Sequence, residues 1–359
     1  MSLPRPRPTV ARMAGYTPGE QPKPGDRINK LNTNENPYPP SPRVLEAIRT
    51  VPPEALRRYP SPTADQFRHV AAHLHGVDPS CILAGNGSDD VLQIALRTYC
   101  GPGDVLASPD PTYSLYPVLA ELADVAFARV PWREGWTLPV EALLATGPRA
   151  IFFANPNAPS GTWVEPPSVA SLAAATDALV LVDEAYVDFA DDNCIGLLAQ
   201  HPNVLVTRTV SKGYGLAGLR FGYAVGHPDV IAQMTKVKDS YNCDAIAIAA
   251  AAAALEDQEY ARARWSDVRA ERARLSSRLS ERGFAVVPSR ANFVLAAVPP
   301  GLSAGHLYAA LKQAGVLVRY FDAPGLDDKL RISVGTAQEM QALIEALDAV
   351  TAGSAPERP

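Results

Sequence analysis

The chain has 359 residues, 47% of them hydrophobic and 20% charged, and a formal net charge of -5. This composition predicts a folded protein with two domains, or with one large domain and a satellite, and argues against disorder. The mild negative charge provides no basic stripe for nucleic acid, and no apolar run approaches the ~18 residues of a membrane span. We therefore expect neither a nucleic-acid partner nor a membrane partner.

Three prolines among the first eight residues predict an extended N-terminal arm. This segment lacks the apolar stretch of a secretory signal. The four cysteines are scattered without a metal-binding or redox spacing, so reduced thiols and a cytoplasmic location are the expectation.

Two helices are expected after the arm. Ser41 is a good N-cap and Pro42 suits the first helical position, so a helix begins there. The stretch 63–75 is amphipathic and ends at Gly76, as a helix with a C-terminal glycine does.

Three histidines of this second helix, His69, His73 and His75, raise the question of a metal site. No acidic or cysteine partner lies nearby in the sequence to complete a ligand set. We interpret the histidines as part of a solvated helix face and expect no metal.

Between residues 81 and 226 short apolar strands alternate with helical patterns. The expected strands cover residues 81–84, 105–107, 125–130, 151–154, 178–182 and 204–206. Near-continuous apolar strands of this kind predict a mostly parallel sheet with helices on both faces, a three-layer α/β/α domain. In such sheets ligands bind at the carboxyl ends of the strands.

A glycine-rich turn, Gly85-Asn86-Gly87-Ser88-Asp89, follows the first of these strands and leads into a helix. Unpaired N–H groups at a helix N-terminus suit a phosphate. An ordinary βα turn is the alternative, because such turns are common.

Polar residues follow three later strands. Asn157 lies in the loop after 151–154, Asp183 comes directly after 178–182, and Lys212 follows 204–206. A buried aspartate needs a cationic partner or hydrogen-bond donors, and a pyridinium nitrogen would serve. The alternative for Asp183 is a helix N-cap.

Lys212 is preceded by Ser211 and followed by three glycines and Arg220. An amine beside small residues can reach a cofactor, and a serine with an arginine can hold a phosphate. This combination suggests a lysine that binds pyridoxal phosphate (PLP) as a Schiff base.

Beyond residue 226 helices are expected at 228–239, 245–255 and 259–281, with Arg272 on a solvated face. From residue 283 the pattern changes to α+β, which indicates a second, smaller domain. Arg319 and Arg331 on its strands could pair structurally or bind an anionic substrate group. The tail 353–359 is expected to be frayed.

We expect the chain to divide into an arm and two domains. The divisions are residues 1–30 for the arm, 51–269 for the large cofactor-binding domain, and 31–50 with 270–359 for the small α+β domain.

Several motifs resemble those of histidinol-phosphate aminotransferases, which are fold-type I PLP enzymes. The motifs are Asn34-Glu35-Asn36-Pro37, Asn-Pro-Asn-x-Pro-x-Gly from Asn155, Asp183-Glu184-Ala185-Tyr186, Thr209-x-Ser211-Lys212-x-x-Gly215-Leu216-Ala217-Gly218-Leu219-Arg220 and Leu330-Arg331-Ile332-Ser333-Val334-Gly335-Thr336. The resemblance spans nearly the whole chain.

The resemblance implies a role for each matching residue. Lys212 would bind the cofactor and shuttle a proton, Asp183 would hold the pyridinium nitrogen, and Tyr186 would contact the ring oxygen O3′. Tyr113 would stack on the ring. The cofactor phosphate would be bound by backbone groups of Ser88 and Asp89, by the side chains of Ser211 and Arg220, and by Tyr59 from the other subunit of a homodimer. Tyr16, Arg319 and Arg331 match positions that contact substrate.

One departure from the family pattern concerns the cofactor. The family has an asparagine that contacts O3′ where this chain has Ala158. Either Asn157 substitutes for it, or Tyr186 alone holds O3′.

Three further departures are milder. Asp90 stands where the family has glutamate, Ser240 replaces the proline of a Pro-Tyr-Asn segment, and Gly213-Tyr214 replaces Ala-Phe.

The expected reaction is transfer of an amino group from histidinol phosphate to 2-oxoglutarate. An aromatic amino acid aminotransferase and a phosphothreonine-type decarboxylase are the alternatives on the same residues. A PLP-binding regulator is disfavoured because the chain has no basic DNA-binding segment. A nicotinamide-binding Rossmann protein is disfavoured because the turn at Gly85 lacks the third glycine.

Overall fold

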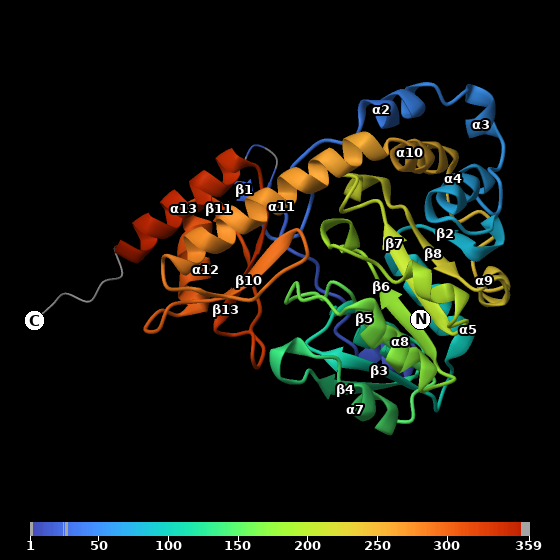
Figure 1. Ribbon diagram of the computed structural model, residues 1–359, viewed down its shortest axis with the longest axis horizontal. Coiled ribbons are helices and arrows are strands. Elements are labelled where there is room, and N and C mark those ends of the chain that lie inside the picture. The colour runs from blue at the N-terminus through green and yellow to red at the C-terminus, as the bar shows by residue number, and fades with distance from the viewer. Residues whose placement is uncertain (1–2, 24, 26–27, 353–359) are drawn as a thin grey trace, which may run out of the picture.

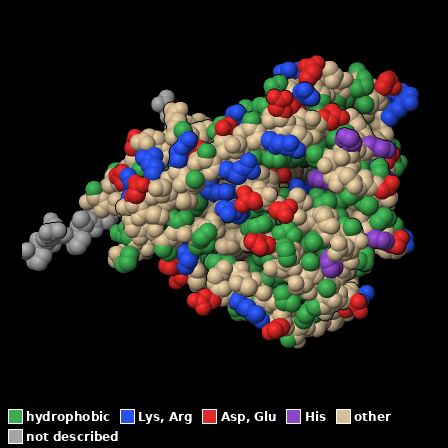
Figure 2. All heavy atoms as spheres, in the orientation of Figure 1, with side chains coloured by type: hydrophobic (Ala, Val, Ile, Leu, Met, Phe, Trp, Pro, Cys, Tyr) green, Lys and Arg blue, Asp and Glu red, His purple; other side chains and the backbone are tan. Residues whose placement is uncertain are grey.

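The computed structural model describes residues 3–23, 25 and 28–352, so the predicted frayed tail lies outside the described residues. Figure 1 shows a large unit around one wide sheet and a smaller unit beside it, with the long helix α11 (Gln258–Ser280) running between them. Figure 2 shows Lys and Arg side chains gathered over this helix on the face in view. Within the described part of the chain, no helix is both long and apolar enough to cross a bilayer.

The large sheet has seven strands in the order β2-β8-β7-β6-β5-β3-β4. Their bounds are β2 Ile82–Gly85, β3 Val105–Asp110, β4 Ala126–Pro131, β5 Ala150–Ala154, β6 Leu179–Asp183, β7 Val204–Thr209 and β8 Gly222–Gly226. Strand β8 runs antiparallel to both of its neighbours, and the remaining pairs are parallel. The predicted mostly parallel sheet is confirmed.

Helices cover both faces of this sheet because its strands are apolar on both sides. In β5, Ile151 and Phe153 belong to one core while Ala150 and Phe152 belong to the other, as the alternation of side chains along a strand requires. The first core is completed by α4 (Asp65–His75), α7 (Val140–Ala145), α8 (Pro166–Ala174) and α10 (Ala245–Glu256). The second is completed by α5 (Ser88–Tyr99), α6 (Leu115–Leu122) and α9 (Pro228–Thr235). The three-layer α/β/α architecture is thereby confirmed.

The smaller unit is an antiparallel sheet of order β12-β13-β10-β9 with helices packed on it. The strands are β9 Ala285–Val286, β10 Phe293–Ala297, β12 Arg319–Tyr320 and β13 Lys329–Ser333, and the helices are α11, α12 Ala304–Gln313 and α13 Ala337–Ala352. Strand β1 (Asn29–Lys30) pairs in parallel with β11 (Val316–Leu317). Residues of α11, α12 and α13 share a hydrophobic core with this sheet, which is the predicted α+β pattern.

The division of the chain into 1–30, 51–269, and 31–50 with 270–359 stays a proposal. Helix α2 (Pro42–Arg49) begins after its N-cap Ser41, packs against α10, and places Val44 in a core of the large sheet. This packing favours moving residues 42–50 to the large unit.

The N-terminal arm contains a short helix, α1 (Pro8–Arg12), which the sequence did not predict. Proline suits the first position of a helix, so Pro8 begins the helix rather than excluding it. The guanidinium of Arg7 donates to the carbonyl of Leu122 at 2.7 Å, which fastens the arm beside α6. A further short helix, α3 (Pro53–Arg57), follows α2.

The expectation that Arg272 lies on a solvated face of α11 is wrong. The side chain is 8% exposed, and its Nη1 donates to the carbonyls of Phe189 at 3.2 Å and Ala291 at 2.8 Å. Phe189 follows β6 and Ala291 precedes β10, so this arginine joins α11 to both units. Burial lowers the pKa of Arg272 to about 10.

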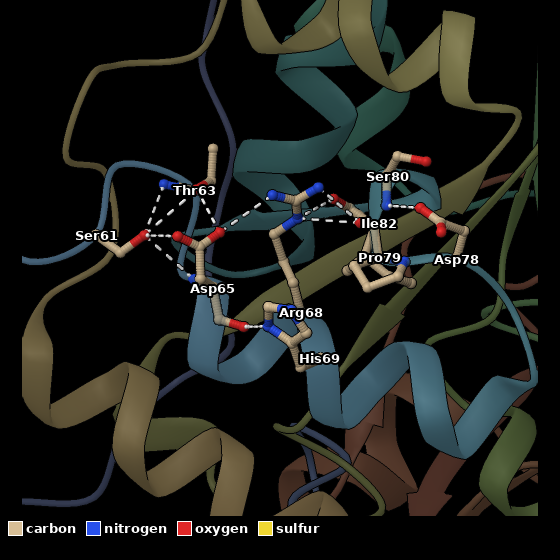
Figure 3. A network of polar contacts seen from close by, with 9 residues as sticks. All are labelled: Ser61, Thr63, Asp65, Arg68, His69, Asp78, Pro79, Ser80 and Ile82. Carbon is tan, nitrogen blue, oxygen red and sulfur yellow. Dashed lines mark hydrogen bonds and ion pairs between the residues drawn. The ribbon is translucent and has the colours of Figure 1, made fainter.

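The three histidines of α4 have separate environments. Figure 3 shows the polar network at the start of this helix, in which His69 Nδ1 lies 2.7 Å from the carbonyl of Asp65. His69 and His73 are exposed, while His75 is largely buried with Nε2 at 2.8 Å from the hydroxyl of Tyr223, which departs from the predicted solvated face. Burial lowers the pKa of His75 to about 3. No metal-ligand cluster is found among the described residues.

Candidate active site

Lys212 lies just beyond the end of β7 with its amine in the interior. Its Nζ donates to the carbonyl of Thr33 at 3.0 Å and lies 5.8 Å from the centre of the Tyr186 ring. Burial, and next the positive charge of Arg331, lowers the pKa of the amine to about 8. A substantial fraction of neutral amine is therefore present at mildly alkaline pH, as a nucleophile or general base requires.

Asp183 is the last residue of β6 and is 3% exposed. Its carboxylate accepts hydrogen bonds from the hydroxyls of Tyr116 at 2.9 Å and Thr207 at 3.0 Å. Burial raises the pKa of the carboxyl to about 6, although these two bonds act in the opposite direction. The alternative role as a helix N-cap is not found, because the next helical turn begins only after Tyr186.

Tyr186 follows Asp183 and is buried. Its hydroxyl accepts a hydrogen bond from Asn34 Nδ2 at 3.0 Å, and its ring meets Phe293 edge to face at 5.0 Å. Burial raises the pKa of the phenol. Ala158 packs into the same apolar cluster, so it offers the phenol no hydrogen bond.

Asn157 follows β5 and is 1% exposed. Its Nδ2 donates to the carbonyl of Pro111 at 3.2 Å and to Ser160 Oγ at 2.8 Å. Its Oδ1 is buried without a hydrogen-bond partner. The side chain can therefore accept one more hydrogen bond, but both of its amide protons are already used.

The guanidinium of Arg220 lies against the glycine turn that precedes α5, an arrangement that suits an anion. Gly87 is the N-cap of α5 with φ at 89°, and a Cβ built on it would lie 2.7 Å from Arg220 Nη2. Ser211 is buried, and its Oγ accepts from Thr209 Oγ1 at 2.9 Å. Arg220 Nη2 also lies 3.7 Å from Asp89, an exposed and long ion pair.

Aromatic rings form a row beside this turn. Tyr113 meets Tyr116 edge to face at 5.6 Å and Tyr16 of the arm at 6.3 Å. The hydroxyl of Tyr113 donates to Asp89 at 3.2 Å. The arm thus brings Tyr16 to the predicted site, although its side chain is 43% exposed.

Arg331 and Arg319 face each other on β13 and β12. The guanidinium of Arg331 lies 5.3 Å from the rings of both Phe293 and Phe321, and its Nη2 donates to the carbonyl of Asn32 at 3.0 Å. Its buried Nε has no partner, and in the described structure neither arginine is ion-paired with a carboxylate. Two like charges held together without a counter-ion favour an anionic ligand.

Tyr59 is the predicted residue that the single chain does not bring to this site. Its side chain is 81% exposed and its ring stacks on Tyr241 at 4.5 Å. The structure also reveals contacts that the sequence did not indicate. Tyr116 and Thr207 carried no motif or spacing signal, whereas Asn34 lay within a quoted motif without an assigned role.

The chain is similar to known aminotransferases over nearly its full length. Residues 26–347 match the family model for aminotransferase class I and II. A histidinol-phosphate aminotransferase of a Nostoc species is 46% identical over 95% of this chain and 96% of that protein. The enzyme of the same name from Rhodopirellula baltica is 46% identical over 94% of this chain and 93% of that protein.

A solved structure agrees with these relatives. Histidinol-phosphate aminotransferase from Sinorhizobium meliloti, determined in complex with pyridoxal-5'-phosphate, superposes with a TM-score of 0.88 at 27% identity, covering 99% of each chain. The chain therefore belongs to the class I and II aminotransferases, in the branch of the histidinol-phosphate aminotransferases.

Proposed function

We propose that this protein is a PLP-dependent aminotransferase that converts histidinol phosphate and 2-oxoglutarate to imidazole acetol phosphate and glutamate. The observation that carries the proposal is the buried Lys212 amine, with its lowered pKa, in one site with Asp183 and a pair of unneutralised arginines. The names of the relatives support the choice of substrate.

The donor set of the site fits PLP. The turn of Gly87 and Arg220 at the N-terminus of α5 suits a phosphate, and the buried carboxylate of Asp183 suits a pyridinium nitrogen. The unpartnered Oδ1 of Asn157 leaves an acceptor for a bound group. We propose that Ser88, Asp89, Ser211 and Tyr113 complete this binding set.

PLP, when bound, supplies an aldehyde carbon that exchanges amines and a ring that accepts the electron pair left by deprotonation of the substrate carbon. Lys212 would hold the aldehyde carbon of the cofactor through its Nζ. The same Nζ would serve as the positioned base for the proton on the substrate carbon. The carbonyl of Thr33, 3.0 Å from Nζ, orients the amine.

Asp183 keeps the proton on the pyridinium nitrogen. Above its pKa of about 6 the carboxylate is ionised, and the cationic ring stabilises that ionised form further. Tyr116 and Thr207 fix the orientation of the carboxylate by one hydrogen bond to each of its oxygens.

Arg331 and Arg319 bind the anionic groups of the substrates in this proposal. Arg331, whose Nε is buried without a partner, can form a paired hydrogen bond with a carboxylate or a phosphate, and Arg319 lies across the strand pair. Tyr16 of the arm lies 6.3 Å from Tyr113 and can close the site on that side.

We further propose a homodimer acting in the cytoplasm, in which Tyr59 reaches the cofactor phosphate of the partner subunit. Large apolar side chains are exposed on and around α2 and α3, namely Leu45, Leu56, Tyr59 and Tyr241. Exposed apolar groups concentrated in one region favour a protein partner.

The test is a steady-state assay with histidinol phosphate or phenylalanine as amino donor and 2-oxoglutarate as acceptor. We expect a yellow protein whose absorption band is removed by borohydride, with faster turnover of histidinol phosphate. Lys212→Ala should abolish turnover, whereas Lys236→Ala, on an exposed lysine, should leave it unchanged. Fast turnover of phenylalanine without turnover of histidinol phosphate would contradict the proposed substrate. Release of carbon dioxide would indicate a decarboxylase. A colourless protein that takes up no PLP would contradict the proposed enzyme class.

A further inference from the structure

Tyr186 packs against the apolar side chains of Ala158, Ala185, Ala291 and Phe293, none of which can form a hydrogen bond. Asn157 does not substitute for the asparagine that is absent at position 158, because its Nδ2 already donates two hydrogen bonds. Any hydrogen bond that this side of the site donates to a cofactor therefore depends on the direction of the Tyr186 hydroxyl.

Asn34 forms a hydrogen bond with the Tyr186 hydroxyl. Its Nδ2 donates to the Tyr186 oxygen at 3.0 Å, and both side chains are buried. An amide nitrogen carries protons and accepts none, so the phenol cannot donate back to Asn34. The phenolic proton is therefore available to an acceptor other than Asn34.

The orientation of the Asn34 amide is fixed by the smaller unit. Ser333 Oγ donates to Asn34 Oδ1 at 3.0 Å and accepts from the backbone N–H of Asn34 at 2.9 Å. The carbonyl of Asn34 accepts from Asn292 Nδ2 at 2.9 Å. Because Oδ1 is occupied by a hydroxyl donor, Nδ2 is the group that faces Tyr186.

The two residues before Asn34 contact the other functional groups of the site. The carbonyl of Asn32 accepts from Arg331 at 3.0 Å, and the carbonyl of Thr33 accepts from Lys212 at 3.0 Å. Three consecutive residues, 32–34, therefore contact Arg331, Lys212 and Tyr186 in that order.

We propose that Asn34 is a positioning residue of the transamination: it directs the Tyr186 hydroxyl toward the cofactor ring and so serves the purpose of the asparagine absent at position 158. This inference rests on the proposed function. The left-handed backbone of Asn34, with φ at 56°, is tolerated by asparagine and glycine better than by most residues.

The test is a pH titration of the absorbance of the PLP-loaded enzyme without substrate, in the wild type, Asn34→Gly and Tyr186→Phe. A hydrogen bond donated to the ring oxygen stabilises its anionic form, so loss of that bond raises the midpoint. We expect Tyr186→Phe to raise it by about one pH unit and Asn34→Gly by about half as much, in line with the strength of one hydrogen bond.

A double variant separates positioning from a merely structural role. If Asn34 acts through Tyr186, Asn34→Gly should produce no further shift in the Tyr186→Phe background. Asn203→Gly is the matched control, because Asn203 Nδ2 donates to the carbonyls of Ala173, Thr176 and Ala178 and to no residue of the site, so it should produce no shift. Asn34→Asp keeps the size and backbone preference of asparagine and serves as a second variant. Its shift in midpoint should be smaller in the Tyr186→Phe background than in the wild-type background.

A shift of full size in both backgrounds, or an equal shift in Asn203→Gly, would overturn the inference. A protein that binds PLP and turns over histidinol phosphate but shows no shift in Asn34→Gly refutes this inference alone. A protein that takes up no PLP refutes the proposed function and this inference with it.

Discussion

The carboxylate of Asp183 makes the cofactor-free protein less stable at neutral pH. Its ordinary pKa of 3.8 rises to about 6 in the fold because of burial. Between these values the folded chain binds more protons than the unfolded chain, so stability falls as the pH rises from about 4 to about 6 and stays lower above that range. A shift of this size corresponds to a cost of the order of 2–3 kcal/mol at pH 8.

Replacement of the Asp183 carboxylate should therefore raise the stability of the cofactor-free protein while it lowers the activity of the enzyme. We expect cofactor-free Asp183→Asn to unfold at higher urea concentration than the wild type at pH 8, with a difference of the order of 2–3 kcal/mol. The difference should shrink markedly at pH 4.5, where the wild-type carboxyl is protonated. Transamination should fall at least about tenfold, because a charge-assisted bond is lost.

Asp229→Asn is the matched control, because the Asp229 side chain is 92% exposed and should show neither effect. A cofactor-free Asp183→Asn that is less stable than the wild type at pH 8 would contradict the assignment of the cost to the buried charge.

At the residue scale, the sequence predicts functional side chains that come just after an apolar strand. Asp183 and Lys212 follow apolar strands, and the structure places them at the carboxyl ends of the adjacent parallel strands β6 and β7. Tyr116 and Thr207 could not be found this way, since one lies inside a helix and the other inside a strand. Their contact with Asp183 depends on which elements neighbour β6, and periodicity does not fix that.

At the scale of elements, the turn between β2 and α5 depends on the glycine at its end. Gly87 has φ at 89°, and Arg220 Nη2 occupies the space that a side chain would need. Alanine at this position combines an unfavourable backbone angle with a contact at 2.7 Å from the guanidinium.

We expect Gly87→Ala to weaken PLP binding at least about tenfold, the effect of displacing one charge-assisted contact. The measurement is a fluorescence titration of the cofactor-free protein with PLP. Gly218→Ala is the matched control, because nothing lies within 4 Å of its Cβ position and its φ is not left-handed. Equal binding by Gly87→Ala and the wild type would rule out this turn as the phosphate site.

The elements themselves were largely predictable. The helix expected at 259–281 is observed as Gln258–Ser280, and the strands follow the apolar runs. The solvated face assigned to Arg272 was wrong because a helix that lies between two units is covered on more than one side. Local periodicity shows which face meets the nearest core, but it does not show a second contact supplied by Phe189 and Ala291.

At the scale of the whole molecule, the site is assembled from segments far apart in the sequence. Asn34 contacts Ser333 across 299 positions, and Lys212 contacts Thr33 across 179. These contacts follow from how the smaller unit packs on the large one, which no local pattern encodes. Local patterns also say nothing about the proposed role of Tyr59, because that role would require contact with a second chain.

Mixing two inactive variants tests whether Tyr59 acts across a dimer. Lys212→Ala and Tyr59→Ala homodimers should each have little activity, because each site lacks either its amine or its phosphate contact. Unfolding and refolding them together should create mixed dimers in which one site carries both substitutions and the other carries none. With random pairing half of the dimers are mixed, so about a quarter of the wild-type activity should return. Refolding each variant alone gives the baseline, and sedimentation velocity checks that the product is dimeric. Activity no higher than the sum of the two baselines in a dimeric product would mean that Tyr59 does not complete the site of a partner subunit.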